Sequence, residues 1–274
     1  MTALFAYSTS HRIEELDAGL LRKDLRDVAL IGDAQEAKPA FLHDPRREPA
    51  AYRSLLAPAG IGPRCVVTGG DWVVLERIDA PVLWQVGDPA TWVAVAAWVA
   101  RMHEQLAARA SDDVPLVVHD EALFATWRER AADAGAPAVV LRAHERATRR
   151  LLDVPPTIVH GDLHASNVLV RSHGTEVEVW PVDWELVGRG PAVLDVAALT
   201  SGDGLARATR NAMVRAYFEA SGRPGSRWTT WLADLDDARL HQCVQWLGWS
   251  PGWTPPAAHR QDWLGQALEL ASRR

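Results

Sequence analysis

Cysteine is scarce in this chain, and long apolar segments are absent. Only Cys65 and Cys243 occur in 274 residues, too few for a disulfide framework and typical of a reducing cytoplasm. The longest apolar run, 92–100, is far shorter than the roughly 20 residues that a membrane-spanning helix needs. The first residues also lack the basic and apolar regions of a secretion signal. We therefore expect a cytoplasmic protein with no membrane partner.

Clusters of lysine and arginine are also missing. The formal net charge is -6, and we find no basic patch in the sequence. A nucleic-acid partner would need such an electrostatic footprint, so we expect none. With 48% hydrophobic and 23% charged residues and no internal repeat, the composition is that of an ordinary globular protein. The length allows one large domain or two small ones that enclose a cleft.

The character of the predicted elements changes near residue 78. Short strands are predicted at 10–16 and 20–25 around an Asp-Ala-Gly turn, and at 64–68 and 72–78. One helix separates these two pairs; it begins at Asp44 and Pro45 and ends near Pro58. Beyond residue 78 apolar residues recur at helical spacing, and short strands interrupt the helices only between 157 and 185. We expect a β-rich unit at 1–78 and a mainly helical unit at 79–274.

The sequence HGDLHASN, which ends at Asn167, contains the residues that indicate a particular reaction most specifically. Asp162 and Asn167 are five residues apart, and Asp183 follows 16 residues after Asn167. Phosphoryl transfer needs a carboxylate beside the attacking hydroxyl and oxygen ligands that hold magnesium on the nucleotide phosphates. The same spacing separates Asp and Asn in the catalytic loop of protein kinases, and Asp183 stands where those enzymes have the aspartate of Asp-Phe-Gly.

The motif continues after this loop with VDWE, Gly190-Pro191 and Asp195-Val196-Ala197. In this combination the chain resembles the aminoglycoside phosphotransferase family, whose relatives include choline, fructosamine and homoserine kinases. The resemblance implies an α+β, protein-kinase-like fold of two lobes, a small β-rich N-lobe with one helix and a larger, mainly helical C-lobe. It also implies that ATP and Mg2+ are used to phosphorylate a hydroxyl of a small molecule: a sugar, an amino sugar, an aminoglycoside or an amine-bearing metabolite.

The resemblance also implies roles for individual residues of the catalytic segment. Asp162 is the expected catalytic base and contacts the acceptor, while Asn167 and Asp183 are the expected magnesium ligands. Asp195 is expected to brace the catalytic loop from a buried position. Glu185 is expected to touch the metal or the acceptor, and His160 is expected to be structural.

On the nucleotide side a lysine on a strand and a glutamate on the next helix are needed. Lys23 and Glu48 form the natural pair; Lys38 is a competitor, but its neighbours do not resemble the middle of a strand. No G-x-G-x-x-G precedes Lys23, so Ser8, Thr9 and Ser10 are the candidates to cover the phosphates. Main-chain groups of Glu76 and Ile78 are expected to hold adenine where the lobes join.

On the acceptor side tryptophan is abundant, with 13 residues in the chain. Aromatic faces stack on sugars or cationic amines, although core packing is the commoner role for any single tryptophan. Trp249 and Trp253 have the stronger claim to face a ligand because they stand in a segment of loop composition. Further candidates for the pocket wall are Trp246, Asp234, Asp236 and Asp237.

Other functions remain open at this stage. A nucleotide-binding pseudokinase is an alternative, although Lys23, Glu48, Asp162, Asn167 and Asp183 are all present. Gly-Asp-x-His also occurs in two-metal phosphoesterases, but their further ligand motifs are missing. A protein kinase is disfavoured because neither Asp-Phe-Gly nor Ala-Pro-Glu occurs. The identity of the acceptor, ATP against GTP, and monomer against homodimer stay undecided.

Overall fold

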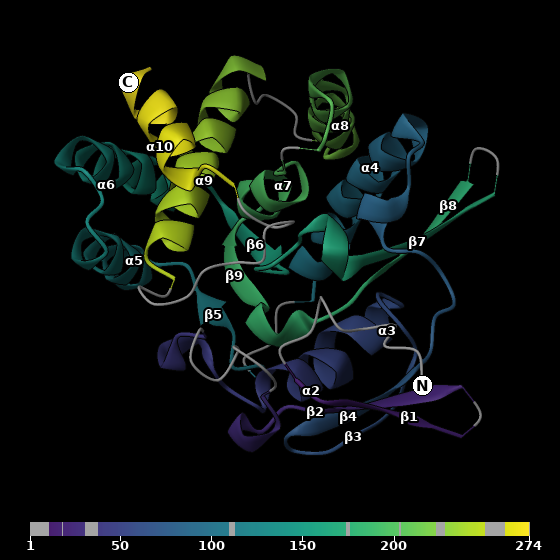
Figure 1. The fold of residues 1–274 in the computed structure, drawn as a ribbon. Coiled ribbons are helices and arrows are strands. Elements are labelled where there is room, and N and C mark those ends of the chain that lie inside the picture. The colour runs from purple at the N-terminus through teal and green to yellow at the C-terminus, as the bar shows by residue number, and fades with distance from the viewer. Residues whose placement is uncertain are drawn as a thin grey trace.

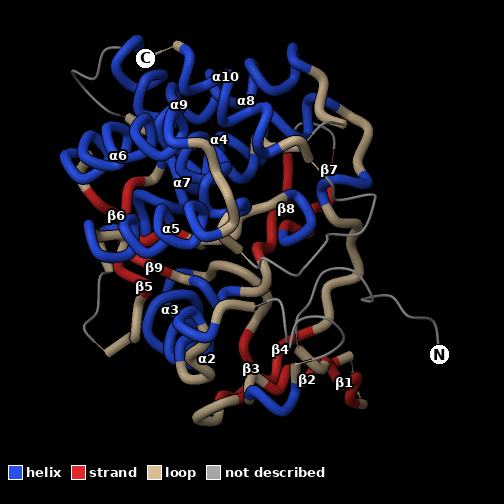
Figure 2. Tube along the Cα trace, turned by 60° about the vertical axis from the view of Figure 1, so that its left-hand side comes forward, coloured by secondary structure: helices blue, strands red, loops and turns tan. Residues whose placement is uncertain are grey.

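The structure, a computed structural model, is an α+β fold in which one antiparallel sheet precedes a mainly helical part. It describes residues 11–17, 19–30, 38–109, 113–173, 176–202, 204–222, 228–249 and 261–273. Figures 1 and 2 show the sheet at one end of the molecule and most helices gathered at the other. The division into units at 1–78 and 79–274 stays a prediction.

The N-terminal sheet has four strands in the order β1-β2-β4-β3, all antiparallel. The strands are β1 (Ile13–Leu16), β2 (Leu20–Asp24), β3 (Cys65–Thr68) and β4 (Trp72–Glu76). Gly19, with φ +72°, provides the left-handed position that the predicted β1–β2 turn requires. Lys23 lies opposite Val73 in the centre of this sheet, and its side chain is buried.

An interrupted helix packs against the N-terminal sheet and the segment around Trp184. It consists of α2 (Arg47–Ala51), a π-helical turn (Tyr52–Leu56) and α3 (Ala57–Ala59). The wider turn directly precedes Pro58, whose ring would otherwise clash with a carbonyl one turn earlier. The first helical residue is Arg47 and not Pro45, two residues later than predicted, because Asp44 and its neighbours form a turn in which the Asp44 carboxylate accepts the Arg46 backbone N–H.

The remaining helices pack around a common core. Asp88 caps α4 as predicted, since its carboxylate accepts the N–H groups of Ala90 and Thr91. A second apolar cluster joins α5, α6, α9 and α10. No helix in the described ranges is both long and apolar enough to cross a membrane. The helices are α4 (Pro89–Ala107), α5 (Glu121–Asp133), α6 (Ala138–Asp153), α7 (Val193–Leu199), α8 (Arg207–Ala220), α9 (Trp228–Leu247) and α10 (Trp263–Ser272).

Short strands hold the catalytic segment between the sheet and the helices (Figure 1). β6 (Pro156–Val159) leads into it, and the predicted hairpin of β7 (Val168–His173) and β8 (Glu176–Pro181) follows it. β9 (Gly188–Pro191) pairs antiparallel with β6 and parallel with β5 (Val117–Val118). Both ends of the loop that contains Asp162 are therefore fixed by backbone pairing.

Candidate active site

The loop after β6 is fixed by a buried carboxylate beneath it. Asp195, which is 1% exposed, accepts the backbone N–H groups of His160 at 2.7 Å and of Gly161 at 3.0 Å. The same carboxylate contacts Nε2 of His103 at 2.9 Å. Burial opposes the charged form, but His103 and these donors outweigh it and lower the pKa of Asp195. This geometry is what the predicted bracing role of Asp195 needs.

His160 has both ring nitrogens engaged. Nε2 donates to the carbonyl of Val182 at 2.9 Å, and Nδ1 accepts the N–H of Asp162 at 3.3 Å. The ring also packs 4.4 Å from that of Trp184. Burial lowers the pKa of His160, so its neutral form is favoured. A fully bonded, neutral imidazole fits a structural role.

Asp162 and Asn167 are brought together by the side chain of Asn167. Its amide nitrogen donates to the backbone carbonyl and to Oδ2 of Asp162, each at 2.9 Å. Burial, followed by the negative charges of Asp183 and Glu185, raises the pKa of Asp162 well above its usual range. The side chain remains 35% exposed, so solvent screens part of this effect. A carboxylate with these neighbours is a stronger proton acceptor than an isolated aspartate.

Asp183 lies beside the predicted lysine–glutamate pair. The Lys23 ammonium contacts Oε2 of Glu48 at 2.6 Å and also contacts Oδ1 of Asp183. Burial alone would lower the pKa of Lys23, but attraction by Asp183, Glu48 and Glu185 raises it above its ordinary value. Asp183 has φ +66°, a left-handed conformation that is unusual outside glycine and is frequent at functional sites. The other oxygen of Glu48 accepts the N–H of Trp184 at 3.3 Å.

Lys38, the competing lysine, contacts a different carboxylate. Its ammonium lies 2.5 Å from Oε2 of Glu185, which His11 also contacts at 3.1 Å. Although burial opposes ionisation, His11, Lys38 and Lys23 together lower the pKa of Glu185 well below its usual range. Arg47, which sequence reasoning did not single out, donates to the carbonyls of Pro115, Leu42 and Glu185 and so anchors this segment.

The oxygen donors at this point fit a magnesium ion. Mg2+ prefers one or two carboxylates together with phosphate oxygens and water rather than a full protein cage. Asp183 offers a carboxylate, and Asn167, whose amide nitrogen faces Asp162, keeps its carbonyl oxygen for a ligand. Among the described residues no group of three or more His, Cys, Asp or Glu side chains forms a metal cage. The Lys23 contact shows that Asp183 already attracts a positive charge.

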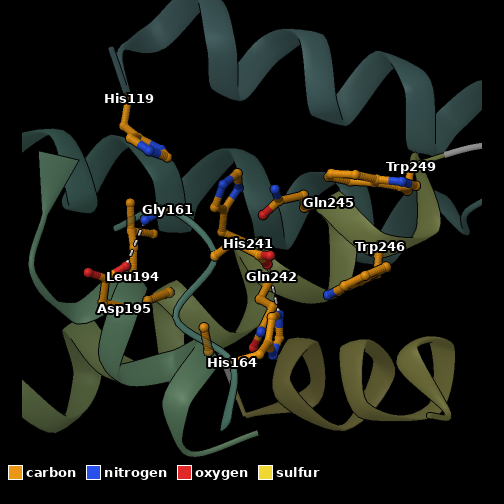
Figure 3. A pocket seen from close by; sticks show the side chains of 13 residues that line it. His119, Gly161, His164, Leu194, Asp195, His241, Gln242, Gln245, Trp246 and Trp249 are labelled. Carbon is orange, nitrogen blue, oxygen red and sulfur yellow. Dashed lines mark hydrogen bonds and ion pairs between the residues drawn. The ribbon is translucent and has the colours of Figure 1, made fainter. Parts of the chain in front are cut away.

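A pocket opens between Asp162 and the C-terminal end of α9 (Figure 3). The indoles of Trp246 and Trp249 stand at one side of it, and His119, Gly161 and Leu194 at the other. Trp249 and Trp246, two of the residues predicted for an acceptor site, are among its lining residues, and contact with an acceptor stays a prediction; His119, Gln242 and Gln245 also line it and were not singled out from the sequence. The lining residues are His119, Gly161, Asp162, His164, Leu194, Asp195, Ala198, Ala238, His241, Gln242, Gln245, Trp246 and Trp249.

Several predicted residues lie elsewhere or cannot be placed. Ser8, Thr9, Ser10 and Trp253 lie outside the described residues. The suggested acids on α9 do not line the pocket; Asp237 is buried and bonds Arg150 at 2.6 and 2.7 Å. Glu76 ends β4, where its carboxylate accepts the N–H of Arg64 at 2.7 Å, and Ile78 follows this strand. Binding of adenine by these two residues stays a prediction.

Comparisons with known proteins agree with this geometry. A sequence model described as the phosphotransferase enzyme family matches residues 37–233. Choline kinase LicA from Streptococcus pneumoniae is similar in structure, with a TM-score of 0.66 at 15% identity over 97% of this chain and 90% of that one. The GDP complex of aminoglycoside 2'-phosphotransferase-IIIa gives a TM-score of 0.64 at 15% identity over 96% of this chain and 88% of that one.

A third solved structure includes a nucleotide analogue and a metal ion. Amicoumacin kinase hAmiN, in complex with AMP-PNP and Ca2+, gives a TM-score of 0.58 at 13% identity over 99% of this chain and 90% of that one. No curated protein matches the sequence. Identities this low show the fold alone, which is the protein-kinase-like α+β fold of these enzymes.

Proposed function

This chain belongs to the phosphotransferase enzyme family, and from that premise we propose that it transfers the γ-phosphate of ATP to a hydroxyl group of a small molecule. One observation supports this most strongly. Asp162 and Asn167 are hydrogen-bonded to each other, and Asp183 nearby holds the buried ammonium of Lys23, which also bonds Glu48. A general base, oxygen ligands and a phosphate-binding cation are the parts that phosphoryl transfer needs.

In the proposed reaction Asp162 positions the acceptor hydroxyl for in-line attack and accepts its proton. A bond forms between the acceptor oxygen and the γ-phosphorus, and the bond from that phosphorus to the bridging oxygen breaks. The bridging oxygen keeps the electron pair and leaves with ADP, while the proton passes from Asp162 to solvent. The products are a phosphate monoester, ADP and one proton.

The remaining charged residues hold and orient the nucleotide. Asn167 and Asp183 would hold Mg2+, which neutralises charge on the phosphates when it is bound. Lys23, kept cationic by its two carboxylates, would move from Asp183 toward the phosphate oxygens while Glu48 retains it. We place the reaction in the cytoplasm, where ATP is available and the two free cysteines stay reduced.

The alternative of a two-metal phosphoesterase is weakened by His160. Both of its ring nitrogens are used within the fold, so neither is available as a metal ligand. A nucleotide-binding pseudokinase would share the same geometry and differ only in turnover. A turnover assay therefore distinguishes a pseudokinase from an active kinase, whereas the arrangement of side chains does not.

Calorimetric titration with AMP-PNP, with and without Mg2+, tests the nucleotide half of this proposal. We expect binding that Mg2+ strengthens, and we expect Asp183→Asn to remove most of that gain because it removes the carboxylate. Asp120→Asn, at the N-terminal cap of α5, serves as the matched control and should leave the Mg2+ effect intact. Absence of nucleotide binding by the wild-type chain would overturn the proposal.

A further inference from the structure

The pocket beside Asp162 offers little negative charge to an acceptor. Among the described lining residues only Asp162 and Asp195 are acidic, and none is lysine or arginine. Asp195 is 1% exposed and is occupied by His103 and by two backbone N–H groups. A single carboxylate, the proposed base, is therefore left to face a ligand.

Acidic residues in the neighbourhood are committed to other contacts. Asp237 bonds Arg150, Asp236 bonds Arg239 at 3.0 Å, and Asp262 accepts the N–H of Gly265 at the start of α10. An acceptor with several ammonium groups would lose water in this pocket and gain only the Asp162 carboxylate as a counter-charge.

Beside Asp162 the pocket offers amide and imidazole groups, and several of these have no hydrogen-bond partner in the described part of the chain. Gln242 and Gln245 stand three residues apart near the end of α9, and no described residue bonds their side-chain amides. His241, 2% exposed, has Nε2 without a hydrogen-bond partner in the described part of the chain, as has His119 at both ring nitrogens. Burial lowers the pKa of His119 to about 4, so its imidazole is uncharged near neutral pH. Such groups favour a ligand with hydroxyls, which both donate and accept.

One side of the pocket is lined by two indoles that stack on further indoles of the fold. The rings of Trp246 and Trp249 are 5.4 Å apart. Trp127 stacks on Trp249 at 5.6 Å and Trp263 stacks on Trp246 at 5.6 Å, each with an interplanar angle of 9°. These contacts fix the indoles before a ligand arrives, and the apolar ring atoms that line the pocket suit the C–H groups of a saturated ring.

We propose that the acceptor is an uncharged, hydroxyl-rich ring, of the sugar or cyclic polyol class, which lies against Trp246 and Trp249 and bonds the amides of Gln242 and Gln245. This inference rests on the proposed function, because one hydroxyl of the ring is presented to Asp162. It makes Gln242 and Gln245 the residues that select the acceptor. It also excludes polycationic acceptors as the preferred substrates.

Binding of small rings in the absence of nucleotide tests the inference independently of catalysis. Saturation-transfer NMR and tryptophan fluorescence would compare D-glucose and myo-inositol with glucosamine, choline and kanamycin. We expect the neutral rings to bind, and the double variant Gln242→Ala/Gln245→Ala to weaken them by about 10-fold or more, since two hydrogen bonds are lost. Gln105→Ala, an exposed change on α4, is the control and should alter binding less than about 2-fold.

A charge-adding variant sharpens this test. Gln245→Glu keeps the size of the side chain and adds a second carboxylate to the pocket beside Asp162, so binding should shift from glucose toward glucosamine. If the wild-type protein binds kanamycin or choline more tightly than any neutral ring, the inference about the acceptor is overturned, while the proposed kinase function is unaffected. Absence of binding by any neutral ring would also overturn it, whereas failure to bind AMP-PNP would overturn only the proposed function.

Discussion

At the scale of single residues, Lys23 is a buried charge whose place depends on two carboxylates. Its side chain and that of Glu48 are 7% and 1% exposed, and the Lys23 ammonium lies 2.6 Å from Oε2 of Glu48. Lys23→Met removes the cation and leaves Glu48 buried beside Asp183 without its partner. Breaking such a pair costs about 3–5 kcal/mol, so we expect the urea midpoint to fall markedly.

The double variant Lys23→Met/Glu48→Met is the informative control for this prediction. Replacing both partners with apolar side chains of similar size should recover part of the lost stability, because Glu48 is no longer a buried unpaired charge, while Asp183 still lacks its ammonium partner. Affinity for the nucleotide should stay low, since the proposed phosphate-binding cation is still absent. A single Lys23→Met variant as stable as the wild type would contradict the proposed importance of the pair.

The candidate residues that could be picked out from the sequence are those whose spacing matches a known catalytic motif. Asp162, Asn167 and Asp183 stand at fixed intervals, and the structure places all three around one point. Arg47 and the pairing of Lys38 with Glu185 were missed because their partners are backbone carbonyls and distant side chains. Gln242 and Gln245 carried a weak signal, a spacing of three residues just before Trp246, which does not reveal a pocket without the fold.

At the scale of elements, the turn from β6 into the catalytic loop requires glycine. Gly161 has φ +82°, and an added Cβ would lie 2.2 Å from the carbonyl oxygen of Leu186. Gly135, at the end of α5, has φ +86° but nothing within 4 Å of an added Cβ. Gly161→Ala should therefore destabilise the protein and displace the neighbouring Asp162. Gly135→Ala should lower the free energy of unfolding by only about 1 kcal/mol, the cost of holding alanine in a left-handed conformation.

Thermal unfolding and turnover of these two variants check the prediction. Because both carry the same conformational cost, the difference between them isolates the clash with Leu186. We expect Gly135→Ala to keep wild-type turnover and Gly161→Ala to lose most of it. Equal melting temperatures and equal rates would show that the loop tolerates the extra atom.

Helices and strands were predictable where apolar residues follow a strand or helix pattern and where a turn or an N-cap marks the end of the element. β1, β2, β3 and β4 followed from short apolar runs around glycine turns, and α4 from its Asp-Pro start and helical spacing. β5 is two residues long and β9 reads Gly-Arg-Gly-Pro, so neither has a strand pattern; their pairing comes from tertiary contacts. The π-helical turn before Pro58 was likewise invisible in the sequence.

At the scale of the whole molecule, buried histidines link stability to pH. His144 on α6 and His241 on α9 are buried, 3.0 Å apart between ring nitrogens, and burial lowers the pKa of His144 to about 3. The unfolded chain, with an ordinary histidine pKa near 6.5, therefore binds more protons than the folded chain below that pH. Stability is full above about pH 6.5 and is lost as the pH falls toward 3.

Urea unfolding at pH 7 and pH 5 measures this linkage. A histidine that stays neutral in the folded state and has an ordinary pKa when unfolded contributes a loss of about 2 kcal/mol over that interval. His144→Phe should reduce the pH-dependent loss by about that amount, although it leaves a His241 nitrogen unpaired at both pH values. Thr148→Val, which removes a non-titrating buried hydroxyl on the same helix, should shift stability equally at pH 7 and pH 5.

The central claim is that this fold catalyses phosphoryl transfer through Asp162. The most direct measurement is acceptor-dependent ADP release from magnesium-ATP, across neutral sugars, amino sugars, aminoglycosides and choline, by the wild-type protein and by Asp162→Asn. We expect turnover with at least one acceptor, and a fall of about 10²- to 10⁴-fold in the variant, because proton transfer contributes that much to the rate. Equal turnover by Asp162→Asn and the wild type would contradict the account, as would a wild-type protein that binds magnesium-ATP yet phosphorylates no acceptor.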